Sequence, residues 1–350
     1  MSESAHNDFG NSQSPVIQFL SVTKSYRRTV AVDDVSYEVP PGVVFALLGD
    51  NGAGKTTSIG AMLGTIRVDS GTVRVLGQDP IRDSVQLRHR IGIVPEQPSL
   101  YDWMTVDQTG WFAAGFHEDG FQTNFRESIK RFGVPPGAKI RQLSKGMKAK
   151  VSLSLATAHE PELLILDEPT SGLDPMVRRE FLESMIERAA TGQTVFLSSH
   201  QINEVERVAD HVALMRQGKL VHCGRLEDIK ASTRELQINV TDVGVPAPPI
   251  GDNLISATRT GRQWRLLVRD LTDDQREGIQ NHPFVDRFVV HEPSLEEIFV
   301  GYVGSQNGSS ANGVSVERGS TNSGSENASR LPGNSDNVGS VTSGQNEVAS

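Results

Sequence analysis

Residues 43–63, VVFALLGDNGAGKTTSIGAML, combine the residue types and spacing that hold a phosphate chain. An apolar strand is followed by the pattern G-x-x-x-x-G-K-[ST] and then by a helix. In this pattern glycines let backbone N–H groups face phosphate oxygens, Lys55 reaches the β and γ phosphates, and the Thr56 hydroxyl ligates magnesium. We therefore predict a nucleotide site. The residues expected to contact the nucleotide are Gly49, Asp50, Asn51, Gly52, Ala53, Gly54, Lys55, Thr56 and Thr57.

A second site candidate follows the apolar run Leu163–Leu166, which is typical of a parallel strand buried on both faces. Asp167 and Glu168 come directly after it, at the strand edge where open α/β sheets bind ligands. We expect Asp167 to hold magnesium through its water shell, and Glu168 to orient and deprotonate the attacking water. A solvated strand end is the alternative, and the proline and SGLD turn that follow argue against it.

The strand TVFLSSH, residues 194–200, ends in a histidine at the same expected sheet edge. There His200 can contact a γ-phosphate or the attacking water, although a lone histidine is often only structural. Glu168, His200 and Lys55 are therefore the catalytic candidates.

A helix start at residues 143–156, LSKGMKAKVSLSLA, carries three lysines in its first turns. A helix N-terminus already holds partial positive charge and unpaired N–H groups, so this arrangement is unfavourable unless an anion lies there.

With these motifs in this order, residues 16–225 resemble the ATP-binding cassette (ABC) family of transporter ATPases. The resemblance rests on the P-loop GDNGAGKTT, the signature LSKGM, the Walker B segment LLILDE, the D-loop SGLD and the H-loop histidine. It implies ATP and Mg²⁺ as ligands. It also implies that the signature helix of one subunit caps the γ-phosphate of ATP held by another, with Ser144 and Gly146 as donors and Asp174 of the D-loop beside the nucleotide.

The resemblance assigns further residues around the nucleotide. Tyr26 falls where the family stacks an aromatic ring on adenine, and an ordinary strand-end tyrosine is the alternative. Lys145 adds attraction for the anion, whereas Lys148 and Lys150 equally fit a solvated face.

Some positions depart from the family pattern. Glu96 stands where the Q-loop usually has glutamine, with Gln97 next to it. A carboxylate ligates magnesium as an amide oxygen does, so we expect Glu96 to join Thr56 and Asp167 as a metal ligand. A shift that puts Gln97 in this role stays open.

The signature also departs, with Lys145 and Met147 in place of the commoner Gly and Gln, and Asp50 replaces the usual P-loop proline. SKGM signatures are similar to those of the branch that powers drug, antibiotic and related exporters. We therefore expect export.

The resemblance implies an α/β fold: a P-loop NTPase with a mostly parallel sheet, an antiparallel β subdomain and a helical subdomain, plus a small C-terminal α+β module. We expect the ABC ATPase domain over residues 15–225, its helical subdomain over about 98–150, and the module over 231–303. Residues 1–14 and 304–350 are rich in Ser, Asn and Gly, so we expect them to be disordered.

The sequence of the module predicts three strands, ELQINV, RQWRLLVRD and VDRFVVHE. It also predicts a polar helix, TDDQREGIQN, and a closing amphipathic helix, SLEEIFVGYV. Its His282 and His291 lack ligand-spaced partners, so a zinc site is not expected.

Composition limits the possible partners. A net charge of −9 without a basic tract argues against nucleic acid. No apolar run reaches the roughly 18 residues that cross a bilayer, and the N-terminus lacks a secretory pattern. We expect a cytoplasmic protein lying peripherally on the inner face of the cell membrane, where it meets an integral membrane permease. Tyr101, Asp102, Trp103 and Met104 are the docking candidates, or else a buried satellite core.

Two other functions compete with a transport ATPase that works as a homodimer or with a paired ABC subunit. A soluble ABC-type switch of translation or DNA maintenance is disfavoured because the chain has one P-loop and no heptad arm. A catalytically dead scaffold conflicts with the presence together of Lys55, Asp167, Glu168 and His200.

Overall fold

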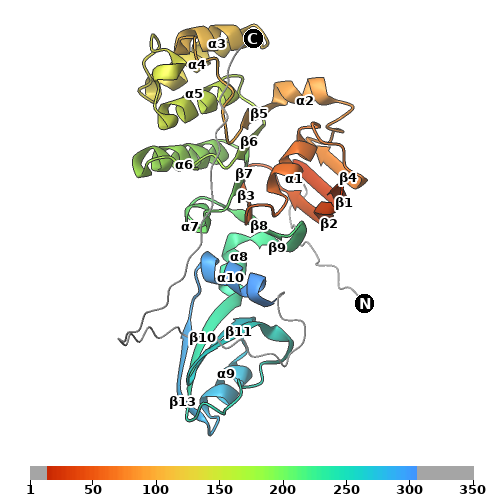
Figure 1. Cartoon of the computed structure of the whole chain (residues 1–350), viewed down its shortest axis with the longest axis vertical. Helices are drawn as coiled ribbons and strands as arrows, with labels where there is room; N and C mark the ends of the chain where they lie inside the picture. The colour runs from red at the N-terminus through yellow and green to blue at the C-terminus, as the bar shows by residue number, and fades with distance from the viewer. Residues whose placement is uncertain (1–13, 306–350) are drawn as a thin grey trace, which may run out of the picture. The chain divides into compact units, whose positions relative to one another are not determined.

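The structure is a computed structural model that describes residues 14–305. Within them the chain forms three β-sheets, and the largest has the strand order β5-β6-β7-β3-β8-β9 (Figure 1). Its strands run parallel except for β9, which is antiparallel to β8. The strands are β3 (Val44–Gly49), β5 (Ile91–Val94), β6 (Leu163–Asp167), β7 (Thr194–Ser199), β8 (His211–Arg216) and β9 (Lys219–Arg225).

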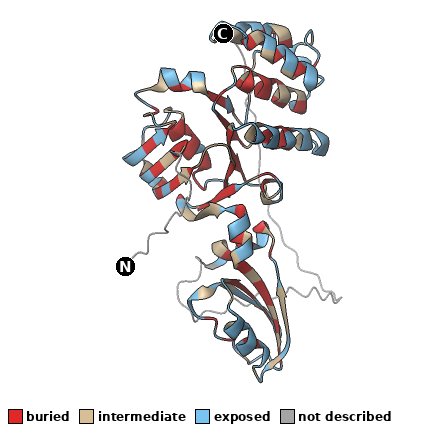
Figure 2. Ribbon diagram, turned by 180° about the vertical axis from the view of Figure 1, so that it is seen from behind, coloured by how far each residue is buried: buried red, intermediate tan, exposed pale blue. Residues whose placement is uncertain are grey.

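Alternate residues of the central strands face two separate hydrophobic cores. In β3, Val44, Ala46 and Leu48 pack in one core, and Phe45 and Leu47 pack in the other. All five are at most 1% exposed, and the central strands are red in Figure 2. A strand buried on both faces needs an unbroken apolar sequence, which is why these strands are readable from sequence.

A smaller antiparallel sheet, in the order β2-β1-β4, borders the second core together with α1 (Lys55–Met62) and α2 (Ser84–Arg90). Its strands are β1 (Ile17–Tyr26), β2 (Thr29–Val39) and β4 (Ser70–Val75). Stacked rings join the two sheets, because Tyr37 lies 4.7 Å from Phe19 and 5.7 Å from Phe45 between ring centroids.

Helices form a third part with its own core. They are α3 (Val106–Ala114), α4 (Phe121–Arg131), η1 (Ile140–Gln142) and α5 (Lys145–Thr157). Phe125 is fully buried against Gly110, where any added Cβ would collide with its ring. The opposite face of α5 packs in the first core, beside α6 (Pro175–Ala190) and α7 (Ile202–Val205). Helix α5 therefore joins the helical part to the large sheet.

The C-terminal part contains a sheet in the order β11-β12-β10-β13. Its elements are α8 (Leu226–Ser232), β10 (Thr233–Val240), η2 (Gly251–Asn253), β11 (Leu254–Thr260), β12 (Gln263–Arg269), α9 (Asp273–Gln280), β13 (Val285–His291) and α10 (Leu295–Ser305). The sequence patterns predict β10, β12 and β13 of this sheet but not β11, an edge strand that pairs with β12 and lacks apolar alternation.

Helix α10 lies against β11 and β12, but none of its described side chains belongs to the hydrophobic core of this sheet. Its Leu295, Ile298 and Phe299 belong to the same hydrophobic core as Val44 of β3. The expected disordered ends, residues 1–14 and 304–350, lie outside the described residues apart from residue 14 and the last two residues of α10. The boundaries 15–225 and 231–303 stay a prediction. Among the described helices, none is long and apolar enough to cross a membrane.

A partly buried histidine lies where α10 meets β9 and β12. The His222 ring stacks on Tyr302 with centroids 5.3 Å apart, and Arg269 Nη2 donates to His222 Nδ1 at 3.2 Å. Burial, together with the smaller effect of the nearby Arg269 charge, lowers the pKa of His222 from 6.5 to about 4. The neutral imidazole is therefore the form that the fold holds.

We predict that this histidine makes the fold acid-sensitive. Because its pKa is lower in the folded chain, stability is fully present above pH 6.5 and is lost as pH falls toward 4. His222→Phe keeps a stacked ring without a titrating group. Between pH 7 and pH 4, the unfolding free energy of the natural chain should fall by roughly 2 kcal/mol more than that of the variant. Urea unfolding of both chains at several pH values measures this, and parallel pH profiles would contradict it.

Candidate functional site

The turn between β3 and α1 is shaped for close approach of an anion. Gly54 has φ 107°, and a Cβ there would collide with the Ala31 carbonyl oxygen of β2. A Cβ at Gly49 would likewise collide with the Met215 carbonyl. Glycine is therefore required at both positions. No side chain in the described chain caps α1, so the N–H groups of its first turn are left for a ligand.

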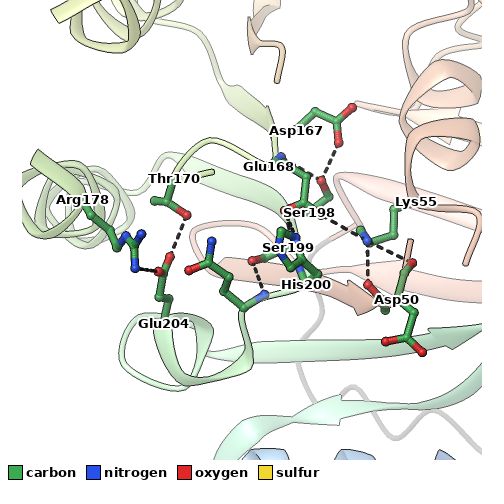
Figure 3. A network of polar contacts seen from close by, with 12 residues as sticks. Asp50, Lys55, Asp167, Glu168, Thr170, Arg178, Ser198, Ser199, His200 and Glu204 are labelled. Atoms are coloured by element: carbon green, nitrogen blue, oxygen red, sulfur yellow. Dashed lines mark hydrogen bonds and ion pairs between the residues drawn. The ribbon is translucent and has the colours of Figure 1, made fainter. Parts of the chain in front are cut away.

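Lys55 is buried at the base of this turn, with 6% of its side chain exposed. Its Nζ donates to the carbonyl oxygens of Gly49 at 2.6 Å and Asp50 at 3.3 Å. The same ammonium lies 3.1 Å from Glu168 Oε1 (Figure 3). The structure thus brings the P-loop lysine and the expected catalytic carboxylate together.

Strands β6 and β7 place the two acidic residues. Asp167 and Ser198 are register partners, and Ser198 Oγ donates to Asp167 Oδ1 at 2.6 Å. Ser198 Oγ also accepts a hydrogen bond from the Glu168 N–H at 3.1 Å. Ser198 was missed from sequence, although two serines that directly follow the apolar run of residues 195–197 and precede His200 are a signal that could have identified it.

Glu168 also contacts His200, the histidine that follows β7. Its Oε2 lies 2.7 Å from Nδ1 of His200, whose side chain is 43% exposed, whereas Glu168 itself is 11% exposed. One carboxylate is therefore held between Lys55 and His200, and the residue has an unusual left-handed φ of 47°. The three catalytic candidates meet at the carboxyl edge of the large sheet, as Figure 3 shows.

The residues present fit Mg²⁺ by their chemistry. Thr56 is exposed in the first turn of α1, and Asp167 uses only one oxygen to accept from Ser198. Hydroxyl and carboxylate oxygens are the donors that Mg²⁺ takes together with phosphates and water. Among the described residues, no group of three or more His, Cys, Asp or Glu could hold a metal ion alone. A nucleotide would have to supply part of the coordination.

Glu96 and Gln97 lie exposed in the loop after β5. In the described chain no hydrogen bond or ion pair joins either residue to Thr56 or Asp167. The choice between the two therefore stays a prediction.

The signature turn lies at the start of α5. Ser144 is its N-cap and accepts from the Met147 N–H at 3.2 Å, and Gly146 is buried against Val177 of α6. Ser144 and Lys145 are exposed. In the described residues no hydrogen bond or ion pair joins this turn to the P-loop.

Two of the three lysines have partners within the chain. Lys148 Nζ lies 3.2 Å from Asp102, and Lys150 Nζ lies 2.6 Å from Glu180 of α6. Their charges are therefore balanced locally, and neither is needed to explain an external anion. Lys145 is left as the exposed basic residue beside the turn.

Tyr26 and Asp174, the remaining residues expected beside the nucleotide, lie at the end of β1 and at the start of α6. Tyr26 ends β1 with 45% of its surface exposed, and Lys24 Nζ lies 5.3 Å from its ring centroid. Since Ala31 on the paired strand touches the P-loop, the ring lies on the hairpin that borders the nucleotide turn. Asp174 is the N-cap of α6 and accepts from two backbone N–H groups at 3.1 Å.

Met104 does not join the docking candidates. It is 7% exposed, whereas Tyr101 and Trp103 are 52% and 65% exposed. Its side chain is removed from solvent, so for Met104 the structure agrees with the buried alternative rather than with docking.

Fold and site together define a P-loop ATPase whose nucleotide turn, carboxylates and histidine share one sheet edge. Residues 32–171 match the family model described as ABC transporter. "Nod factor export ATP-binding protein I" of Paraburkholderia xenovorans is 31% identical over 82% of this chain and 97% of its own length. "Linearmycin resistance ATP-binding protein LnrL" of Bacillus subtilis is 33% identical over 80% of this chain and 84% of its own.

A solved structure of an "ATP binding subunit of ABC transporter" superposes with a TM-score of 0.57 at 29% identity, over 62% of this chain and 92% of that chain. The chain belongs to the ABC transporter family, as one of its ATP-binding proteins. Its nucleotide is ATP, and it is an ATPase.

Proposed function

We propose that the chain is the ATP-hydrolysing subunit of an exporter, which drives a separate integral membrane permease through ATP-dependent dimerisation. The observation that carries this is the contact of Glu168 with both Lys55 and His200 at an open sheet edge. Export is supported by the names of the two relatives, which concern Nod factor export and linearmycin resistance.

The proposed chemistry begins with the ion pair at the P-loop. Lys55 moves from Glu168 to the β and γ phosphates when ATP binds, and this releases the Glu168 carboxylate. Glu168 then orients the attacking water and accepts its proton, while His200 holds the carboxylate or the γ-phosphate in place. Mg²⁺, held by Thr56 and Asp167 with Glu96 or Gln97, would neutralise phosphate charge.

A second chain completes the site in this proposal. The exposed signature turn of one chain would face ATP on the other, where Ser144, the Gly146 backbone and the α5 N-terminus donate to the γ-phosphate. Asp174 and the Tyr26 ring would border the same nucleotide. The partner is a second copy or a paired ABC subunit.

An aromatic surface on the helical part supports permease docking. Its members Tyr101, Trp103, Trp111, Phe112 and Phe116 are 40–66% exposed. Large apolar side chains gathered on one exposed segment mark interaction sites. We propose that a cytoplasmic segment of the permease covers them, which places the chain peripherally on the inner face of the membrane. The alternative is a soluble ABC-type switch without a permease.

Replacing the proposed base tests the chemistry. Glu168→Gln should lower ATP turnover by roughly 10² to 10⁴ because the amide cannot accept the proton. ATP affinity should be retained, and size-exclusion chromatography with ATP should show a trapped dimer. Glu183→Gln, an exposed residue of α6, is the control. Normal turnover of Glu168→Gln would show that another group is the base.

Two defective chains test the shared site. Lys55→Ala should lower ATP affinity by about tenfold or more, and Ser144→Arg should abolish turnover while its own P-loop still binds ATP. A mixture should recover part of the activity, because one chain supplies an intact P-loop and the other an intact signature turn. A mixture as inactive as its components would contradict the proposal.

Capture from native membranes tests the transport half of the proposal. The natural chain should co-purify with a polytopic membrane protein, and Trp103→Ala should reduce the recovery severalfold by removing a docking side chain. Phe284→Ala removes another aromatic residue, 51% exposed on the C-terminal part, and should have no effect. Recovery of only ribosomes, DNA or soluble proteins would favour the switch.

A further inference from the structure

The segments that carry Glu168 and His200 are joined a second time by a buried contact. Thr170, two residues after Glu168, donates from Oγ1 to Oε2 of Glu204 at 2.6 Å (Figure 3). Glu204 lies four residues after His200, on α7. Thr170 is 3% exposed and the Glu204 side chain 13%. Two side-chain contacts, Glu168 to His200 and Thr170 to Glu204, therefore tie the same two segments together.

The other oxygen of Glu204 is bound by a third segment. Arg178 of α6 lies with Nη1 2.6 Å from Glu204 Oε1, and its Nη2 donates to the Leu173 carbonyl at 3.1 Å. A mostly buried carboxylate needs such compensation at both oxygens. The Arg178 guanidinium thus fixes Glu204 and, through Leu173, the loop that follows Glu168.

Local structure alone does not hold these segments. Helix α7 is a single turn of four residues, and an isolated turn of this length is unstable in water. Glu168 has a left-handed φ of 47°, which a non-glycine residue keeps only when its surroundings impose it. Ser198 holds the Glu168 N–H on one side, and the Thr170 contact anchors the chain on the other.

We propose that Thr170, Glu204 and Arg178 are positioning residues for ATP hydrolysis. They set the distance between the Glu168 carboxylate and the His200 imidazole without touching the nucleotide. This inference rests on the proposed roles of Glu168 and His200 in the reaction. The three residues would then contribute to the rate of ATP turnover and not only to the stability of the fold.

Thr170→Val in the full chain tests the proposal, because valine keeps the shape and removes the hydroxyl. The kcat should fall about tenfold to a hundredfold, because a displacement of the Glu168 carboxylate by up to about 1 Å would misplace the attacking water. The KM for ATP should change less than twofold, and Thr170→Ser should restore most of the rate. Thr109→Val is the matched control, since Thr109 is equally buried and its hydroxyl donates to the Thr105 carbonyl at 2.9 Å in α3.

A second variant keeps the test valid if Thr170→Val does not fold. Glu204→Gln has nearly the same size and its amide oxygen can still accept from Thr170, but its NH₂ group cannot accept from the Arg178 guanidinium, so the ion pair is lost. It should lower kcat without raising KM, whereas Glu183→Gln, which breaks the exposed pair with Arg179 on α6, should change neither.

Combination with His200→Ala separates positioning from general destabilisation. If the network acts through the Glu168–His200 contact, Thr170→Val should cost little further activity once His200 is absent. An equal fold-loss with and without His200, or an unchanged kcat in Thr170→Val, would overturn the inference. Glu168→Gln is measured in parallel to separate the two hypotheses. Normal turnover of Glu168→Gln would contradict the proposed role of Glu168 as the base, whereas reduced turnover of Glu168→Gln would support that role and leave only the positioning role of the network to be decided by Thr170→Val.

Discussion

The buried ammonium of Lys55 is the constraint on which the site depends. A cation that is 6% exposed needs compensation, and here it comes from two carbonyl oxygens of its own loop and from Glu168. The carbonyl of Gly49 can reach this charge only because the turn curls tightly, and that curl requires glycine where neighbouring backbone leaves no space for a Cβ. The loop, the lysine and the carboxylate are therefore one electrostatic unit.

The large sheet makes this unit possible. Parallel strands end at a common edge, so β3, β6 and β7 deliver the P-loop, the acidic pair and the histidine to one place. Register sets the finer arrangement, since Asp167 lies directly opposite Ser198 and the serine hydroxyl then reaches the Glu168 N–H. Each strand is rigid because both of its faces are buried.

The C-terminal part contributes to the same core. Helix α10 buries three apolar side chains beside the central strands, so residues near the end of the described chain help to hold the sheet that carries the site. The helical part is connected differently, through α5, which packs on both the helical core and the sheet. In the proposed function, α5 would connect the nucleotide site to the exposed aromatic surface.

The family, the strands buried on both faces and the residues that meet at the sheet edge could be predicted from sequence, because motif spacing and unbroken apolar runs are local properties. The sequence did not show that Lys148 and Lys150 pair with Asp102 and Glu180, or that Met104 is buried, because those contacts join distant segments. The folded chain was needed to show that the Glu168 carboxylate lies between Lys55 and His200, and that α10 packs in the central core. Such arrangements depend on which elements pack together, and a linear pattern does not specify that packing.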